Sequence, residues 1–322
     1  MMKSPVFLCD SISGAYLYFY FMAKKHSRRR RSLGKRNKRG GLLRSLRTLV
    51  VSAVVSFGVA TWAINPQLIE SIDIDALVTA LDLDRFIGER QTSLPAASVE
   101  GYVQTSFAEC KGFFPEQKPP MVPAGEALRE LCFTPFAILH SGKTKTPVFV
   151  AQRLNRQMLK AGQEIERTDR FYEEARLPRA ERASLKDYKG TGYDRGHMSP
   201  AGDMHNEEAM AQSFSLANIV PQDAQHNRGA WSSVENDTRK YVMRAQGDVY
   251  IFTGPVYEPQ PETIGERQVA VPTYIYKVVY DATTGMTRVH WHENSSEQVM
   301  GKPISYQKFV RRTGLDFLGL SH

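Results

Sequence analysis

The stretch DRGHMSPAGDM, residues 194–204, contains residue types that suit the hydrolysis of a phosphate ester. His197 offers an imidazole that is largely neutral near pH 7 and is therefore a good general base for deprotonating water. Arg195 offers a guanidinium group that can pair with a phosphate through two hydrogen bonds. Gly196, between them, allows a close approach of the backbone. Together these residues indicate phosphodiester cleavage.

Further along the chain, Asn227 is a candidate ligand for a cation. Its neutral amide oxygen suits a hard cation such as Mg²⁺, which keeps most of its water ligands. Residues four apart on an α-helix are offset by only about 40°, so Asn227, Trp231 and Glu235 are predicted to share a face. Glu235 would then hold a metal-bound water. Each residue alone also has a structural explanation, such as a helix cap or a solvated helix position, so the hypothesis depends on their combination.

The elements that must carry these residues are a mixture of strands and helices. Stretches rich in Val, Ile and Tyr, or alternating in polarity, predict strands at residues 136–140, 147–152, 192–200, 216–221, 248–257, 270–281 and 286–293. Helices are predicted at residues 207–213, 227–245 and 304–315, with Gly314 ending the last one. Strands with interspersed helices predict an α+β fold, with a mixed or antiparallel central sheet flanked by helices.

The sequence resembles the DNA/RNA non-specific endonuclease family. The resemblance depends on DRGHMSPAGDM, on NIVPQ at residues 218–222, and on the spacing of Asn, Trp and Glu that begins at Asn227. It extends from about Cys132 to Arg312. It implies a ββα-metal active site that uses Mg²⁺, with Mn²⁺ as an alternative, to cut DNA and RNA into products with 5′-phosphate ends.

The resemblance also implies a role for each site residue. His197 would be the general base, Asn227 the direct metal ligand, Arg195 a contact to the phosphate, and Glu235 a partner of a metal-bound water. The family also uses an upstream arginine, for which Arg167 and Arg170 are candidates, and we prefer Arg167. Family members are often dimers, so a homodimer is possible, although nothing in the sequence locates an interface. The alternative function is a membrane-tethered nucleic-acid-binding module of the same fold without catalysis, against which the intact motifs argue.

Two further histidines have a spacing that suits metal binding. His290 and His292 lie two residues apart on a predicted strand and therefore share a face. No third ligand lies near them in the sequence, so a packing role is favoured over a metal pair.

The N-terminal part has the features of a membrane-targeting segment. The formal net charge of the chain is +8, but twelve Lys or Arg and no acidic residue lie between Lys24 and Arg47. Lys3 and Asp10 cancel, so subtracting those twelve leaves residues 48–322 at −4, and bulk charge does not favour nucleic-acid binding. Residues 48–64 carry no charge and are followed by acidic residues. This order predicts a single span with the N-terminus in the cytoplasm.

We therefore predict four segments. Residues 1–47 form a basic cytoplasmic segment, 48–69 a transmembrane anchor, 70–130 a linker with short helices, and 131–322 the endonuclease domain. The anchor would hold the catalytic domain on the periplasmic side of a bacterial inner membrane. A cleaved signal peptide and a buried core helix are the alternatives to the anchor, and the start at Met1 or at Met22 stays open.

Cys110 and Cys132 lie 22 residues apart in a region that reads as loop. A disulfide between them is favoured if this region lies outside the cytoplasm, where oxidation is possible. The alternative is two buried free thiols.

Overall fold

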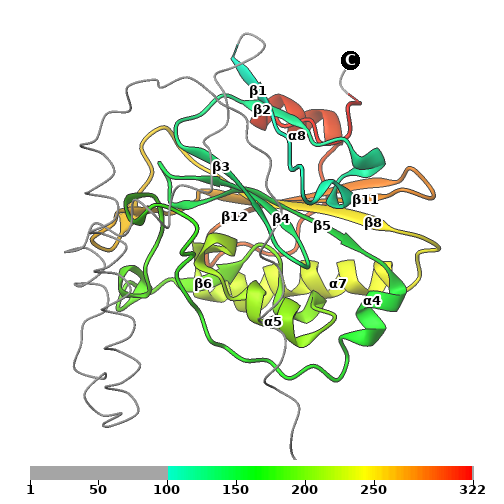
Figure 1. Cartoon of the computed structure of the whole chain (residues 1–322), viewed down its shortest axis with the longest axis horizontal. Coiled ribbons are helices and arrows are strands. Elements are labelled where there is room, and N and C mark those ends of the chain that lie inside the picture. The colour runs from blue at the N-terminus through cyan, green and yellow to red at the C-terminus, as the bar shows by residue number, and fades with distance from the viewer. Residues whose placement is uncertain (1–100, 321–322) are drawn as a thin grey trace, which may run out of the picture. The chain divides into compact units, whose positions relative to one another are not determined.

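The computed structural model describes residues 101–320, and Figure 1 shows how their elements are arranged. A six-stranded sheet in the order β12-β11-β8-β5-β4-β3 forms the centre, and every neighbouring pair in it is antiparallel. Its strands are β3 (Leu128–Cys132), β4 (Ala137–Ser141), β5 (Thr146–Leu154), β8 (Val249–Val256), β11 (Tyr274–Asp281) and β12 (Thr287–Glu293). The prediction of an α+β fold with an antiparallel central sheet is confirmed.

The remaining elements are short. Three two-stranded ladders are formed by β1 (Tyr102–Gln104) with β2 (Met121–Pro123), β6 (Asp194–His197) with β7 (Ile219–Gln222), and β9 (Thr263–Ile264) with β10 (Val269–Ala270). The helices are α4 (Arg156–Ala161), α5 (Glu207–Ser213), α6 (Ala224–His226), α7 (Ser232–Val242) and α8 (Tyr306–Thr313). Gly314 ends α8 in the left-handed conformation, with φ of 69°, as predicted.

The central sheet separates two differently covered faces, because successive side chains of a strand point to opposite sides. Along β11, Tyr276 and Val278 pack with Phe309 of α8, whereas Ile275 packs with Trp231 and the helices of the other side. Figure 1 shows α8 on one side of the sheet and α5 and α7 on the other. We call the first side the α8 face and the second the site face.

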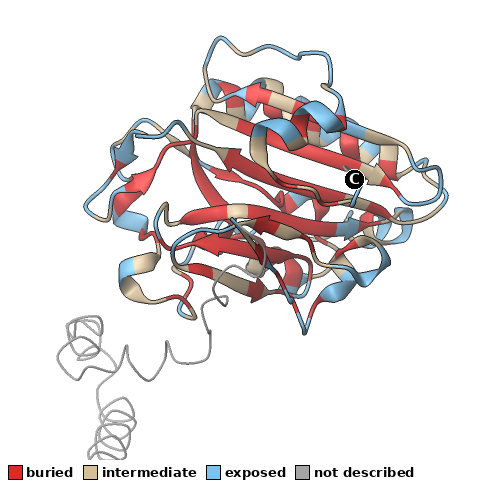
Figure 2. Cartoon of the chain, turned by 90° about the horizontal axis from the view of Figure 1, so that it is seen from above, coloured by how far each residue is buried: buried red, intermediate tan, exposed pale blue. Residues whose placement is uncertain are grey.

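The α8 face holds a dense aromatic core. The rings that meet there are completely or almost completely buried, and they are Phe107, Phe114, Phe149, Phe252, Tyr276, Phe309 and Phe317. Phe252 and Phe317 stack with their ring centroids 4.3 Å apart. The strands appear as mostly buried ribbons in Figure 2. Burying each such ring contributes roughly 1.5–3 kcal/mol, so this face is a major source of stability.

The part of the expected linker that the structure describes is an ordered part of the domain. We expected residues 70–130 to be a linker because prolines and glycines cluster there, but β1, β2 and the first residues of β3 lie within it. Phe107 and Phe114 anchor this segment in the aromatic core. The prolines occupy positions that tolerate them, such as Pro115 at the start of a 3₁₀ turn. The predicted boundary at residue 131 is therefore too late.

A disulfide joins Cys110 to Cys132, with their Cα atoms 5.8 Å apart, as predicted. The bond ties the N-terminal segment to the end of β3, at the edge strand of the central sheet. Cys110 itself is buried in the α8-face core.

The predicted basic segment, residues 1–47, and the predicted anchor, residues 48–69, lie outside the described residues. Within residues 101–320, no helix combines the length and the apolar composition that a bilayer span requires.

Candidate active site

The predicted site residues lie on two strands followed by a helix. His197 ends β6, which runs antiparallel to β7 with His197 opposite Ile219 and Asp194 opposite Gln222. After β7 the chain enters α6, and Asn227 follows directly at the start of a widened helical turn that leads into α7. This is the β–β–helix order that the resemblance implied.

The helix that carries Asn227 differs from the uniform α-helix that we expected over residues 227–245. Residues Asn227–Trp231 form a π-helical turn, and the regular helix α7 begins only at Ser232. A π turn contains more residues than an α turn, so the assumed offset of about 40° per four residues does not apply across it. Accordingly Trp231 is completely buried, whereas Asn227 and Glu235 keep partial exposure. The prediction of one continuous α-helical face was wrong for this reason.

Asp194 fixes the side chain of Asn227. The Nδ2 group of Asn227 donates a hydrogen bond to Oδ2 of Asp194 over 2.9 Å. The same carboxylate accepts two hydrogen bonds from Arg228, at 2.9 Å from Nε and 2.6 Å from Nη2. Because its nitrogen is engaged, the side chain of Asn227 has its carbonyl oxygen left for a ligand. An amide oxygen is a donor that fits a hard divalent cation.

His197 sits in an aromatic enclosure. Its ring lies 5.1 Å from that of Phe214, edge to face, and 5.4 Å from that of Phe171. Only 9% of the residue is exposed, and its Nε2 atom is buried without a hydrogen-bond partner among the described residues. Burial, followed by the charges of Arg167 and Arg195, lowers the pKa of His197 to about 3. The imidazole is therefore neutral at pH 7, as a general base must be before it accepts a proton.

Two arginines lie over the rings that enclose His197. The guanidinium carbon of Arg195 is 4.2 Å from the centroid of Phe171, and that of Arg167 is 5.2 Å from the centroid of Phe214. Arg167 also pairs with Asp169 at 2.7 Å. Both arginines are exposed, so both can meet a phosphate. No ring contact or ion pair within residues 101–320 involves Arg170, whereas Arg167 lies over the ring of Phe214.

Glu235 lies on α7, within the electrostatic influence of Lys277 and Asp203. Burial raises the pKa of Glu235 to about 7, and this effect is opposed first by Lys277 and increased by Asp203. Lys277 itself is buried in the middle of β11, where its Nζ donates to Oγ1 of Thr253 over 2.8 Å. Arg167 lowers the pKa of both Glu235 and His197, so these groups share one electrostatic environment.

Several residues that support the site were not predicted. Asn218 holds the segment after His197, since its amide accepts from the backbone of Ser199 and donates to the carbonyls of Ser199 and Ser213. The roles of Asp194, Phe171, Phe214 and Lys277 were also missed. Asp194 and Asn218 begin the motifs DRGHMSPAGDM and NIVPQ, so the sequence singled out both residues but not the contacts that they make with distant segments.

The part of the chain that the structure describes contains no cluster of three His, Cys, Asp or Glu residues able to hold a metal. His290 and His292 belong to no such cluster among the described residues. Both are buried, and Nδ1 of His292 lies 3.3 Å from Nε2 of His226 in a packed cluster. A site based on the single amide of Asn227 is of a different kind, because water and phosphate would supply its other ligands.

Two pockets on the described surface are relevant here. One of about 480 Å³ lies beside the disulfide and contains none of the predicted site residues. The other, of about 320 Å³, adjoins the site through Asp194 and Arg195.

Comparison with known proteins supports the same assignment. A family model described as DNA/RNA non-specific endonuclease matches residues 119–318. The mitochondrial nuclease EXOG of Xenopus laevis is 34% identical over 179 residues, which cover 51% of this chain and 49% of its own length. The mitochondrial endonuclease G of Homo sapiens is 31% identical over 155 residues, covering 45% of this chain and 52% of its own. The chain thus spans about half the length of these curated relatives.

A solved structure has a similar fold. The structure described as the EndoG/EndoGI complex, on the mechanism of EndoG inhibition, superimposes with a TM-score of 0.53. It is 25% identical in sequence, and the match covers 58% of this chain and 84% of that one. The family model spans well over half of the chain and includes every predicted site residue. The chain therefore belongs to the DNA/RNA non-specific endonuclease family.

Proposed function

We propose that the protein is a Mg²⁺-dependent endonuclease that hydrolyses DNA and RNA without regard to the sugar. The observation that carries the proposal is the arrangement on β6. One end of this four-residue strand presents His197, kept neutral by burial, and the other presents Asp194, which orients the amide of Asn227. A neutral base and an oriented ligand for a hard cation are two requirements of phosphodiester hydrolysis.

His197 serves as the general base in this proposal. Its Nε2 is enclosed, so Nδ1 is the nitrogen left to accept a proton from the attacking water. The rings of Phe171 and Phe214 keep the imidazole in one orientation. A fixed and neutral base loses little free energy in reorganisation when the water approaches.

The exposed guanidinium groups of Arg195 and Arg167 bind the non-bridging oxygens of the phosphate. Contacts to phosphate carry no sequence information, which fits low sequence preference. A divalent cation bound at Asn227 would neutralise charge that develops on the phosphate and on the leaving oxygen. Glu235 would accept a hydrogen bond from a water ligand of that cation. Such a reaction would leave 5′-phosphate and 3′-hydroxyl ends.

We also propose that residues 48–69 anchor the chain in a bacterial inner membrane, with the catalytic domain in the periplasm. The charge order around the apolar stretch supports this orientation. The disulfide between Cys110 and Cys132 also supports it, since structural disulfides persist in oxidising compartments. A reporter enzyme fused at the C-terminus should be active only if that end is exported, and activity confined to a cytoplasmic reporter would contradict the orientation.

The proposed activity is tested by incubating the detergent-solubilised full chain with supercoiled plasmid and with single-stranded RNA. We expect nicking and RNA cleavage with Mg²⁺, neither with EDTA, and 5′-phosphate ends that accept ligation. If both substrates stay intact over a range of Mg²⁺ and Mn²⁺ concentrations, the catalytic proposal is wrong and a binding module becomes the better account.

A further inference from the structure

The pocket of about 320 Å³ lies directly beside the proposed catalytic residues. It is lined by Leu185, Tyr188, Lys189, Tyr193, Asp194 and Arg195. Its volume lies at the lower end of the ~300–1,000 Å³ typical of small-molecule sites. Arg195 belongs both to this pocket and to the enclosure of His197, so a ligand in the pocket would adjoin the phosphate being cleaved.

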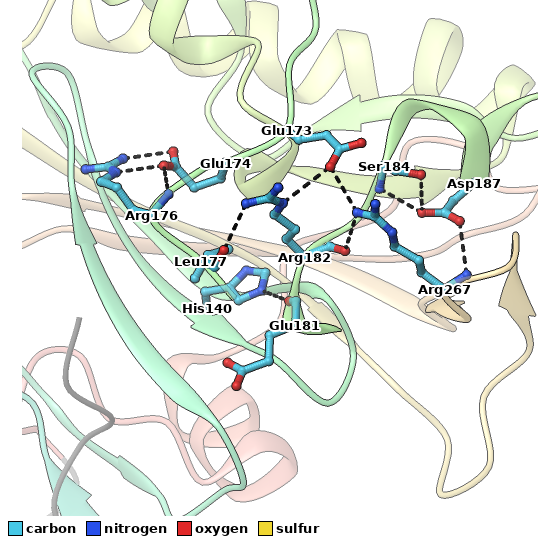
Figure 3. Close-up of polar contacts among 10 residues, drawn as sticks. All are labelled: His140, Glu173, Glu174, Arg176, Leu177, Glu181, Arg182, Ser184, Asp187 and Arg267. Carbon is cyan, nitrogen blue, oxygen red and sulfur yellow. Dashed lines mark hydrogen bonds and ion pairs between the residues drawn. The ribbon is translucent and has the colours of Figure 1, made fainter. Parts of the chain in front are cut away.

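The wall of the pocket is rigidly built. Leu185–Tyr188 form a 3₁₀ turn whose start is fixed by Asp187, which accepts hydrogen bonds from the backbone and the hydroxyl of Ser184 at 2.7 and 2.9 Å. The other oxygen of Asp187 accepts from the backbone of Arg267 at 3.1 Å. The guanidinium of Arg267 in turn pairs with Glu173, as Figure 3 shows. The turn is therefore tied to two other segments of the chain.

Hydrogen bonds and ion pairs connect the wall of the pocket to the segment that packs on His197. Glu173, which Arg182 and Arg267 hold, lies two residues after Phe171, which packs on His197. Figure 3 shows Glu173 in contact with both Arg182 and Arg267. The distance between the pocket and His197 is thereby fixed, as a subsite for a neighbouring part of one substrate requires.

The lining suits an aromatic and anionic ligand. Leu185 is 42% exposed and offers an apolar surface, and the partly exposed ring of Tyr193 lies in the same pocket. The exposed Lys189 adds a positive charge at the wall. The negative charge of Asp194 is already compensated, because Arg228 pairs with it. An apolar and aromatic surface beside a cation is the combination that binds a base with its phosphate.

We propose that this pocket is a subsite for the base of the nucleotide next to the cleaved phosphate, with Tyr193 and Leu185 contacting the base and Lys189 contacting the following phosphate. The inference rests on the proposed function and adds the substrate feature that the site recognises. A base reaches the pocket only when it is unstacked from its neighbour, so single-stranded or locally unpaired nucleic acid is the preferred substrate class.

The first test compares Tyr193→Ala with Tyr193→Phe on two substrates. One is a single-stranded hexanucleotide, and the other is bis(p-nitrophenyl) phosphate, which has a phosphodiester but no neighbouring nucleotide. The loss of one stacking contact should lower kcat/KM on the hexanucleotide about tenfold more than on the small diester, mainly through KM. Tyr193→Phe keeps the ring and loses only the hydroxyl bond to Glu262, so it should stay within about threefold of the unmodified protein.

The second test uses exposed residues whose replacement leaves the core intact. Lys189→Glu should raise KM for the hexanucleotide at least about fivefold and reduce its dependence on salt. Lys308→Glu is the matched control, because Lys308 is equally exposed but lies on α8, on the opposite face of the sheet. It should leave KM within about twofold.

The outcomes separate the two proposals. If the unmodified protein cleaves neither substrate, the proposed function fails. The subsite is then tested by binding alone: the affinity for a labelled hexanucleotide is measured by fluorescence anisotropy for the unmodified protein, for Tyr193→Ala and for Lys189→Glu. Unchanged affinity in both variants overturns the subsite. If cleavage occurs but Tyr193→Ala affects both substrates equally, or if Lys308→Glu acts like Lys189→Glu, the subsite is likewise overturned.

Discussion

The two faces of the central sheet are packed with different kinds of side chain. On the α8 face the strands contribute rings and aliphatic groups such as Phe149, Phe252 and Tyr276. On the site face the same strands, at alternate positions, contribute buried polar groups, among them Lys277, which lies one residue after Tyr276. Burying polar groups costs free energy unless partners compensate. The difference indicates that the α8 face serves mainly to stabilise the domain. On the site face, polar groups that function requires are buried at a cost in free energy.

The histidines illustrate the same difference. His140 and His290 both lie on the site face, and burial lowers the pKa of each to about 4. His197 belongs to the same group, with a pKa of about 3. On the α8 face burial acts on a tyrosine instead, since it raises the pKa of Tyr276, so the site face differs in holding the buried histidines.

The largest effect on stability is expected from the α8 face. Phe149→Ala removes a completely buried ring from the aromatic core and should lower the free energy of unfolding by about 3–5 kcal/mol. The plasmid-nicking rate of the fraction that remains folded should stay within about threefold of the rate of the unmodified protein. Denaturant titration and nicking assays check both values, with Val299→Ala, at a position that is 73% exposed, as the control. If Phe149→Ala lowered the nicking rate without lowering the free energy of unfolding, the contrast between the two faces of the sheet would be wrong.

The disulfide on the α8 side should contribute somewhat less. It closes a loop of 22 residues, for which the chain-entropy estimate is roughly 3 kcal/mol. The variant with both Cys110→Ala and Cys132→Ala should therefore unfold at lower denaturant concentration by this amount, while its nicking rate at low temperature is kept. Equal stability of the oxidised protein and the variant would show that the bond contributes nothing.

Acid should destabilise the domain through the site face. His140 has a pKa of about 4 in the folded state and about 6.5 when unfolded, so only the unfolded chain binds a proton between these values. Its contribution is complete above pH 6.5 and is lost as the pH falls toward 4. At about 1.4 kcal/mol for each unit of pKa, the loss by pH 4.5 is roughly 2–3 kcal/mol.

His140→Gln isolates this effect, because the amide can still donate to the carbonyl of Glu181, which Nε2 of His140 contacts at 2.8 Å. The variant should lose about 2–3 kcal/mol less than the unmodified protein between pH 7 and pH 4.5, as measured by urea titration at each pH. Parallel losses in the two proteins would mean that His140 is not the group responsible.

Asn227→Ala should act on the metal requirement rather than on the fold. Loss of the amide oxygen should raise the Mg²⁺ concentration for half-maximal nicking at least about tenfold, with little change in unfolding free energy, because Asn227 is partly exposed. Asn236→Ala, an exposed position on α7, serves as the control. An unchanged Mg²⁺ response in Asn227→Ala would remove this residue as a ligand.

Much of the fold was predictable because its signals are local. Alternating or β-branched runs identified β4, β5, β8, β11 and β12, and Gly314 marked the end of α8. The helix at residues 207–213 was predicted with the bounds that the structure gives. These patterns depend only on the period of burial, which the sequence records directly.

The failures were all decided by contacts between distant segments. Pro and Gly made the region before residue 131 look like a linker, yet burial of Phe107 and Phe114 orders residues there. Nothing in the sequence NRGAW distinguishes a π turn from an α turn, and the structure shows a π turn over Asn227–Trp231. The motif offered His197, Arg195 and Asn227 as candidates, but it did not predict the aromatic rings that enclose the histidine.

The central claim is that His197 is the base of a metal-dependent hydrolysis, and the most direct test is the rate of Mg²⁺-dependent plasmid nicking by His197→Ala. The far-UV circular dichroism of the same preparation shows whether the fold is kept. We expect the rate to fall at least about 100-fold with an unchanged spectrum. A folded His197→Ala protein that nicks plasmid within threefold of the unmodified rate would contradict the account.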